Sequence, residues 1–372
     1  MSTGGRLVDL VQDRLDGFLD ARSPILAAIS DDTAPMESIS RDFLRFGKRF
    51  RARFCYWGWQ AVQAADDWGV PFDDEGSHDL PAVVGAAAAL ELFHAAALVH
   101  DDLIDASDTR RGAPAAHRSF ERLHRDRGFV GDAARFGESS AILLGDLLLV
   151  WSDELFAESI DTLRDRENAR AARGEYNRMR TDVTAGQYLD VVAEGGWPHV
   201  PQGSEVDHAV NVITYKSAKY SIEAPLAIGA NLGGASLAQM AALRDFGVPL
   251  GIAFQLRDDL LGVFGDSEVT GKPAGDDLVE GKRTVLIALA RRALPASARR
   301  TIDELLGDPD LTTEQVMTLQ ETIRRSGAID ETEAMIAENV ERAIEALDGA
   351  PLTADARDAL LDLADSISVR TA

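Results

Sequence analysis

Apolar residues recur at three- and four-residue spacings near both ends of this 372-residue chain, and this period restricts those segments to helices. The first stripe comprises Leu7, Leu10, Val11, Leu15, Phe18 and Leu19, and the last comprises Ile336, Val340, Ile344 and Leu347, ahead of Gly349 and Pro351. Thr312 and Gln315 have the spacing of a capping box before another periodic run, which Gly327 closes. No series of alternating Val, Ile and Thr segments is present to build a sheet. The sequence therefore predicts an all-α chain.

Two stretches have the composition of surface loops. Residues 66–81 are rich in acids, Gly and Pro, and residues 195–204 hold three glycines and two prolines. Neither stretch is long enough to separate independent domains. We therefore expect residues 1–372 to form a single helical domain.

The formal net charge of −24 excludes classes of partner. Such a surface repels nucleic acid and disfavours attachment to an anionic membrane face. The longest apolar stretch, residues 82–90, is too short to span a bilayer and ends at Glu91, and the chain start lacks the pattern of a signal peptide. We expect no transmembrane segment, a cytoplasmic location, and a buried, inert thiol at Cys55, the only cysteine.

A first carboxylate cluster follows a long apolar run. Asp101 and Asp105 are one helical turn apart and share a face, with Asp102 beside them. Three acids gathered at the end of a buried helix repel one another, so they either lie in solvent or are compensated by a cation. Magnesium suits them, because it prefers oxygen ligands and takes one or two carboxylates with substrate phosphates. Arg110 and Arg111 follow closely, and guanidinium groups match phosphate oxygens, so the segment points to a diphosphate substrate.

A second acidic pair, Asp258 and Asp259, follows another apolar run far downstream. The glycine-punctuated loop after it carries Lys272 and Lys282, which can serve as point charges for phosphate. Two such clusters can hold one diphosphate through several magnesium ions. Basic residues are also dense between Arg45 and Arg53, and this contrast with the acidic protein favours an anion site there.

Together these segments resemble the trans-isoprenyl diphosphate synthases, the family of farnesyl and geranylgeranyl diphosphate synthases. The resemblance covers residues 45–284, and its motifs stand in family order. They are Gly47-Lys48-Arg49-Phe50-Arg51, Asp101-Asp102-x-x-Asp105 with Arg110-Arg111-Gly112, Leu144-Gly145-Asp146, Gly186-Gln187-x-x-Asp190, Lys216-Ser217, Phe254-Gln255-x-x-Asp258-Asp259, and the loop from Gly271-Lys272 to Lys282.

The resemblance implies a bundle of antiparallel helices around a deep central cavity, and a homodimer. It implies that about three Mg²⁺ ions are held on an allylic diphosphate by Asp101, Asp102, Asp105, Asp258 and Asp259. Direct diphosphate contacts would come from Arg110, Lys216, Lys272 and Lys282. The site for isopentenyl diphosphate would comprise Lys48, Arg51, His94 and Arg111, with Arg49 nearby. Gln187 and Asp190 would line the region between the clusters, and Ser217 and Gln255 would stabilise the carbocation.

One departure from the family pattern affects the metal site. Gly262 stands where the second motif normally has its third acid, and Asp266 is the acid that we expect to help through water. The expected consequence is a weaker affinity for metal at the second cluster.

Positions before the first cluster line the pocket for the growing tail in this family. Ala96 and Ala97 are small where farnesyl-producing members carry an aromatic residue, and Phe93 lies one further turn away, about 5 Å deeper. This arrangement predicts a geranylgeranyl product with Phe93 as the floor. A farnesyl or a longer product is the alternative if another helix sets the floor.

Two other functions remain open. A class I terpene cyclase also ionises a prenyl diphosphate with magnesium, but it has an Asn/Ser/Glu motif that is missing here, and the basic patch at Lys48 would have no purpose. A non-catalytic partner subunit would have lost acids or lysines, and Gly262 alone favours that reading.

Overall fold

The structure, a computed structural model, describes residues 3–45, 47–63, 78–201, 203–265 and 275–368. Within these ranges the regular elements are helices, apart from a two-stranded hairpin, so the all-α prediction is confirmed. The chain divides into two compact units, Met1–Gly174 with Pro225–Ala235, and Glu175–Ala224 with Ser236–Ala372. The expected single domain and the expected central cavity stay predictions.

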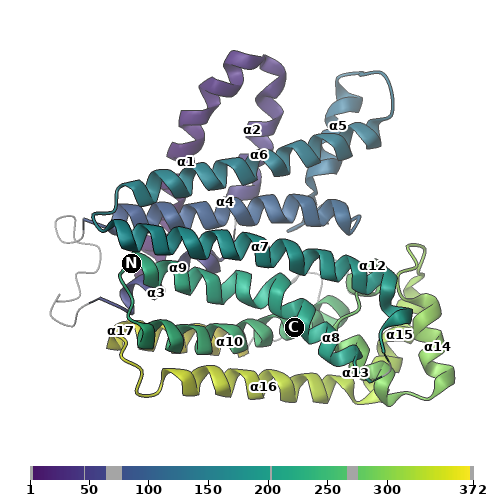
Figure 1. The fold of residues 1–372 in the computed structure, drawn as a ribbon. Coiled ribbons are helices and arrows are strands. Elements are labelled where there is room, and N and C mark those ends of the chain that lie inside the picture. The colour runs from purple at the N-terminus through teal and green to yellow at the C-terminus, as the bar shows by residue number, and fades with distance from the viewer. Residues whose placement is uncertain (1–2, 46, 64–77, 202, 266–274, 369–372) are drawn as a thin grey trace. The chain divides into compact units, whose positions relative to one another are not determined.

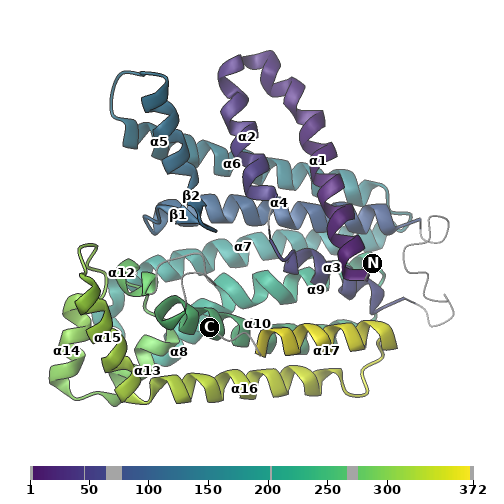
Figure 2. The ribbon, with the colours of Figure 1, turned by 180° about the vertical axis from the view of Figure 1, so that it is seen from behind.

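Unit 1 is built around a long central helix, α4 (Leu80–Ile104), which runs beside α6 (Ala133–Asp161) (Figure 1). Its other elements are α1 (Thr3–Ile29), η1 (Asp31–Thr33), α2 (Ala34–Leu44), α3 (Phe50–Gln60), β1 (Thr109–Arg110), β2 (Ala113–Pro114), α5 (Ala116–Asp126), α9 (Ala224–Leu232) and the first turns of α7 (Arg166–Gly196). The antiparallel β1–β2 hairpin directly follows α4, with Arg110 paired to Ala113 (Figure 2).

Small residues bring the helices of unit 1 into close contact. A Cβ atom on Gly85 of α4 would lie 2.8 Å from the Cβ of Ser159 on α6. A Cβ atom on Gly58 of α3 would lie 2.9 Å from the Cα of Leu226 on α9. Because real Cβ atoms do not approach other atoms so closely, glycine is what allows these backbones to pack together.

Helix α4 is the one described helix that is long and apolar enough to cross a membrane by length and composition. Its most apolar window is 83% buried inside the protein, as expected for the core helix of a globular fold. The apolar run does not stop at Glu91, because this carboxylate is buried and paired: its Oε2 lies 3.1 Å from Arg49 Nη1, and its Oε1 accepts from the backbone N–H of Ala52 at 3.2 Å.

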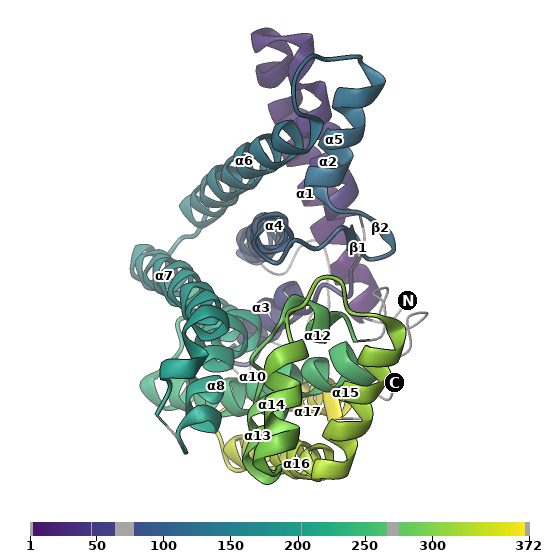
Figure 3. The same ribbon diagram turned by 90° about the vertical axis from the view of Figure 1, so that its right-hand side faces the viewer.

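Unit 2 is centred on α10 (Leu237–Phe264), which packs against α16 (Ala328–Leu347) and α17 (Ala354–Ser368) (Figure 2). The remaining elements are the rest of α7, η2 (Trp197–His199), α8 (Glu205–Ile213), η3 (Thr214–Glu223), α12 (Asp276–Glu280), α13 (Val285–Ala293), α14 (Ala296–Leu305) and α15 (Thr313–Ser326). Figure 3 looks onto the end of this unit where α13, α14 and α15 gather.

The sequence signals at helix ends and faces hold where they are purely local. Thr312 and Gln315 form a reciprocal capping box on α15, and Gly327 closes that helix with φ of 81°. Leu7, Val11 and Leu15 are buried along α1. Cys55 is buried as well, and burial raises the pKa of its thiol to about 12.

The structure tests the two loop predictions only in part. Of residues 66–81, positions 66–77 lie outside the described part, and α4 already begins at Leu80. In 195–204 the expectation was wrong at its start, because α7 extends through Gly196 and a 3₁₀ turn follows at Trp197–His199. Glycine lowers helix propensity by about 1 kcal/mol without forbidding the helix, so two glycines at the last turn of α7 do not by themselves end it.

Candidate functional site

The three acids of the first cluster sit at the C-terminal end of α4 in different surroundings. Asp102 is fully buried and accepts hydrogen bonds from Arg110 of β1, from Nε at 2.7 Å and from Nη2. Asp101 and Asp105 are only partly buried, and Asp101 Oδ2 lies 3.8 Å from Arg110 Nη2. The β1–β2 hairpin therefore returns Arg110 onto the acids that precede it, and Asp102 fixes its position.

His100, directly before the cluster, is held against α6. Its Nε2 lies 3.5 Å from Asp146 Oδ1 and 3.4 Å from the carbonyl oxygen of Ile142. A Cβ atom on Gly145 would lie 2.6 Å from the Cδ2 and Cε1 atoms of the ring and closer still to Nε2, so the Leu144-Gly145-Asp146 motif provides both the space and the partner for this imidazole. The end of α4 is thereby fixed at the turn that carries Asp101.

The basic residues predicted to bind the second substrate come together around His94 on α4. Burial, followed by the charges of Arg51, Arg111, Arg110 and Arg49, lowers the pKa of His94 well below its ordinary value, so the ring is neutral at pH 7. Burial also lowers the pKa of the Arg111 guanidinium. Several cations gathered around one neutral imidazole form a site for an anion.

Two of these arginines stand in a backbone conformation that is uncommon outside glycine. Arg49 has φ of 51° and Arg111 has φ of 54°, and Ala106 is the third such non-glycine residue in the described ranges. The left-handed region costs roughly 1–2 kcal/mol for an ordinary residue, so the surrounding structure must impose it. At Gly47, where φ is 141°, a Cβ atom would meet the Arg111 guanidinium at 3.4 Å. Because 3.4 Å is an ordinary van der Waals distance, the positive φ is what favours glycine at this position.

Arg49 differs from its neighbours because it is buried inside unit 1. Its guanidinium pairs with Glu91 and donates to Gln12 Oε1 at 2.6 Å and to the carbonyl of Leu44. Lys48 is exposed and Arg51 is partly buried. Arg49, at the start of α3, thus links this helix to α1 through Gln12 and to α4 through Glu91.

In unit 2 the second acidic pair lies on the last turns of α10. Asp258 is partly exposed, whereas Asp259 is 4% exposed and accepts from Gln255 Nε2 at 2.8 Å through Oδ1. The Oδ2 atom of Asp259 is buried and accepts no hydrogen bond from the described residues. Burial, opposed by the Gln255 hydrogen bond and reinforced by Asp277, Asp258 and Asp190, raises the pKa of Asp259 well above its ordinary value. The neutral form of Asp259 is therefore favoured by its burial and by the carboxylates around it.

Asp190 on α7 joins the two lysines of unit 2 that were predicted to bind diphosphate. Its Oδ2 lies 2.5 Å from Lys216 Nζ and 3.4 Å from Lys282 Nζ. Glu194, one turn further along α7, accepts from Lys282 at 3.1 Å. The prediction from sequence missed Glu194, although its four-residue spacing from Asp190 was the available signal.

Lys216 and Ser217 lie on η3, a ten-residue π-helix that no sequence pattern announced. A Cβ atom on Gly186 of α7 would lie 2.7 Å from Lys216 Cα, and one on Gly251 of α10 would lie 2.7 Å from Ala218 Cβ. Glycines on both neighbouring helices therefore allow the wider helix to pack between them. Since π-helical turns are frequent at functional sites, this segment agrees with the predicted role of Lys216.

The remaining predicted residues are placed as follows. Gln187 is partly buried on α7, and its Nε2 has no hydrogen-bond partner in the described part of the chain. Phe93 and Ala96 are buried on α4, and Ala97 is partly exposed. Lys272 and Asp266 lie outside the described residues.

The acids of the two aspartate motifs can supply some, but not all, of the oxygen ligands of a magnesium ion. Within the described ranges no three carboxylate, imidazole or thiolate groups are arranged to hold a metal ion by themselves. Magnesium usually takes only one or two carboxylates and completes its shell with waters and phosphate oxygens. The buried Oδ2 of Asp259 and the partly exposed Asp101 and Asp258 supply oxygen donors of that kind.

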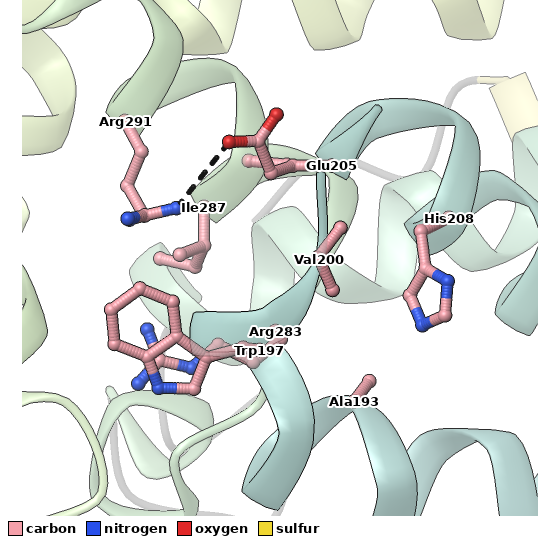
Figure 4. A pocket seen from close by; sticks show the side chains of 9 residues that line it. Ala193, Trp197, Val200, Glu205, His208, Arg283, Ile287 and Arg291 are labelled. Atoms are coloured by element: carbon pink, nitrogen blue, oxygen red, sulfur yellow. Dashed lines mark ion pairs between the residues drawn. The ribbon is translucent and has the colours of Figure 1, made fainter. Parts of the chain in front are cut away.

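A separate pocket in unit 2 contains none of the predicted residues (Figure 4). The Arg283 and Arg291 guanidinium groups lie over the Trp197 ring, 4.2 and 4.4 Å from its centre. Arg291 also donates to Asp303 at 2.7 Å. Burial lowers the pKa of Arg283 to about 10. These contacts attach the segment after α7 to α13, next to Lys282, and explain how that lysine is positioned.

Comparison with known proteins agrees with these sites. The family model described as "Polyprenyl synthetase" matches residues 34–323. Geranylfarnesyl diphosphate synthase of Aeropyrum pernix is 33% identical over 287 residues, which cover 76% of this chain and 81% of that protein. The short chain isoprenyl diphosphate synthase of Methanocaldococcus jannaschii is 30% identical over 248 residues, covering 67% and 68%.

A solved structure shares the whole fold. Geranylgeranyl pyrophosphate synthase from Corynebacterium glutamicum, complexed with isoprenyl diphosphate and magnesium, is 38% identical, with 100% of both chains covered and a TM-score of 0.90. The family model, the sequence relatives and this shared fold all identify the same class of enzyme. The chain therefore belongs to the polyprenyl synthetase family and is a trans-prenyltransferase of isoprenoid biosynthesis.

Proposed function

We propose that this enzyme condenses isopentenyl diphosphate with an allylic diphosphate and that its main product is geranylgeranyl diphosphate. The observation that carries the proposal is the arginine cluster around His94, which includes Arg51 and Arg111. A protein of net charge −24 concentrates these cations around one imidazole. A reaction with two diphosphate substrates requires such a second anion site, whereas a cyclase with one substrate does not.

The allylic substrate is held by the acidic motifs and their neighbouring cations. Asp101, Asp102, Asp105, Asp258 and Asp259 hold about three magnesium ions, with Asp102 acting chiefly by fixing Arg110. Magnesium supplies the Lewis-acid neutralisation of charge that the departing diphosphate requires.

We assign four cations to the leaving diphosphate. They are Arg110, Lys216, Lys272 and Lys282. Asp190 keeps Lys216 and Lys282 in place before substrate arrives. Charged donors that are already oriented stabilise the developing charge without further reorganisation.

Isopentenyl diphosphate binds at Lys48, Arg51, His94 and Arg111, and Arg49 supports this site from beneath. As the allylic C–O bond ionises, the homoallylic alkene attacks the carbocation, and loss of a proton completes the addition. Ser217 and Gln255 direct hydroxyl and carbonyl dipoles toward the cation, and Gln187 lines the same region. The helical walls exclude water that would quench the cation.

The product length rests on the buried face of α4. Phe93 is 4% exposed and lies two turns before Asp101, and the small Ala96 and Ala97 leave the path to it open. The relatives support a range of lengths, because one makes geranylfarnesyl diphosphate and the solved structure is a geranylgeranyl diphosphate synthase. From the position of Phe93 we propose geranylgeranyl diphosphate as the main product, with farnesyl and longer products as the alternatives.

The assembly that we propose is a cytoplasmic homodimer in which residues 1–372 act as one domain. Helix α6 exposes three apolar side chains in a stripe, Ile142, Leu143 and Val150, and Leu143 is 60% exposed. A second copy covering this stripe would remove that apolar surface from water. Light scattering checks this assembly. We expect the wild type to be a dimer and Leu143→Asp to shift toward monomer.

The direct test of function is an assay with labelled isopentenyl diphosphate and an allylic primer. We expect incorporation of label that requires Mg²⁺ and that Asp258→Asn abolishes. A hydrocarbon formed from geranylgeranyl diphosphate alone would identify a cyclase. Activity only after addition of a second, different chain would identify a partner subunit.

A further inference from the structure

Lys282 belongs to the short segment that joins α12 to α13, and this segment is fixed at both of its ends. Gly281, with φ of 81°, ends α12 and lies so close to Gly307 that a Cβ atom on it would be 2.9 Å from the Gly307 Cα. Thr284 then begins α13 as its N-cap residue. What the side chains of Lys282 and Arg283 contact therefore decides how the backbone between these two points is held.

The two side chains are held by the same end of α7. The Lys282 ammonium lies 3.1 Å from Glu194 and 3.4 Å from Asp190, both on α7. The Arg283 guanidinium instead lies over the ring of Trp197, the first residue after α7, with 4.2 Å between its Cζ atom and the ring centre (Figure 4). The last turns of α7 and the residue that follows them therefore contact both members of the pair.

The Trp197 ring restrains Arg283 more closely than any hydrogen bond does. The Nε and Nη1 atoms of Arg283 are buried and donate no hydrogen bond to the described residues. The Asp303 carboxylate lies 3.7 Å from Nη1, beyond hydrogen-bond reach, and accepts instead from Arg291 at 2.7 and 3.2 Å. The Arg283 side chain is only 12% exposed, and a cation removed from water gains most from an aromatic face.

From these contacts we infer that Trp197 is a positioning residue of the allylic site, which acts through Arg283 to set where Lys282 presents its ammonium group. Arg283 and Lys282 share a planar peptide bond, so a displaced Arg283 also displaces the backbone that carries Lys282. Trp197 itself touches neither substrate in this account. The inference rests on the proposed function, which assigns Lys282 to the leaving diphosphate.

A purely structural role for Trp197 makes a different prediction. Ile287 of α13 lines the same cavity as Trp197 and is 2% exposed. Ile287→Ala therefore removes apolar packing at the same place but leaves the contact between Trp197 and Arg283, which makes it the matched control for loss of stability. Trp197→Phe is the conservative variant, because it keeps an aromatic face for the guanidinium.

The first test combines steady-state kinetics with thermal denaturation. We expect Trp197→Ala to lower kcat about tenfold, since small misplacements of a catalytic group are costly, and Trp197→Phe to recover most of this loss. KM for isopentenyl diphosphate should not change, because Lys282 is not assigned to that substrate. Ile287→Ala should lower the melting temperature and leave kcat unchanged. An unchanged kcat in Trp197→Ala, or an equal fall in Ile287→Ala, would overturn the inference.

A double-mutant cycle tests whether the effect passes through Arg283. Arg283→Met removes the cation and keeps a long side chain. If Trp197 acts through Arg283, Trp197→Ala combined with Arg283→Met should lower kcat no further than Arg283→Met alone. Losses that multiply in the double variant would contradict this path.

Chemical labelling of Lys282 gives a readout that does not need chain elongation. Lys282 is 9% exposed, so an amine-reactive acetylating reagent should modify it slowly in the wild type. Mass spectrometry should find faster modification of Lys282 in Trp197→Ala but not in Ile287→Ala. This result in a protein that does not elongate would refute the proposed function and still support the positioning of Lys282 by Trp197. Equal rates of Lys282 modification in the wild type and Trp197→Ala would overturn the inference.

Discussion

Asp190 and Lys216 form an ion pair of 2.5 Å that joins α7 to the π-helical segment η3. The same Asp190 oxygen lies 3.4 Å from Lys282, so one carboxylate orients two of the cations assigned to the leaving diphosphate. Gly186 makes this possible by letting η3 approach α7. In this arrangement Asp190 positions the lysines and need not touch the reacting atoms.

Asp190→Asn should therefore weaken catalysis by misplacing the lysines. We expect kcat/KM for the allylic diphosphate to fall about 10- to 100-fold, since hydrogen bonds to charged groups contribute roughly 1.5–3 kcal/mol. Asp182→Asn is the matched control, because Asp182 pairs with Lys219 at 3.3 Å between the same two helices. Steady-state kinetics on both variants measure this difference. An equal fall in kcat/KM in both would contradict a specific positioning role for Asp190.

Substitutions of Asp101 and Asp102 should differ in their effect on the free energy of unfolding. Asp102→Ala leaves Arg110 without its buried partner, so we expect a loss of about 3 kcal/mol in the free energy of unfolding. Asp101→Ala breaks a partly exposed contact of 3.8 Å with Arg110 and should cost less than about 1 kcal/mol while still abolishing elongation. Urea denaturation of both variants measures this contrast. Similar losses of stability would contradict the different surroundings described for the two acids.

His94 should make the protein less stable in acid. Its pKa is lowered in the folded state by burial and by the surrounding arginines, whereas the unfolded chain binds a proton near pH 6.5. The contribution of neutral His94 to the free energy of unfolding is fully present above pH 6.5. It is lost as the pH falls below that value, because the unfolded chain then binds a proton. Between pH 7 and 5.5 the free energy of unfolding of the wild type should fall by about 1 kcal/mol more than that of His94→Asn. Denaturation curves at both pH values test this, and parallel losses would show that His94 is not the group concerned.

Phe93→Ala should lengthen the product if Phe93 forms the floor of the tail pocket. The substitution removes a side chain that is 4% exposed and opens space on α4, so chains longer than geranylgeranyl are expected. Because a buried Phe→Ala change costs about 3–5 kcal/mol, the melting temperature must show that the variant is folded at the assay temperature. An unchanged product distribution from a folded, active variant would assign the floor to another helix.

The sequence was most informative where one short segment decides the outcome. The stripe from Leu7 to Phe18, the capping box at Thr312 and the stop at Gly327 depend on neighbours in the chain, and each was predictable. The acidic and basic motifs were found for the same reason, since each is a contiguous run of chemistry-bearing residues.

What could not be predicted depends on contacts between distant segments. The position of Asp277 at Gly262 requires α12 to return to the end of α10, and nothing in either segment alone encodes that return. The π-helical form of η3 depends on glycines in two other helices. Arg49 belongs to a substrate-binding motif by sequence, yet only the fold reveals its burial against Glu91 and Gln12.

The most direct test of the central claim is the chain length of the product made from isopentenyl diphosphate and dimethylallyl, geranyl or farnesyl diphosphate in the presence of Mg²⁺. Chromatography of the dephosphorylated products should show geranylgeraniol as the main species, absent after chelation of the metal and in Asp101→Ala. Failure of the folded wild-type enzyme to incorporate isopentenyl diphosphate with any of the three primers would contradict the proposed function.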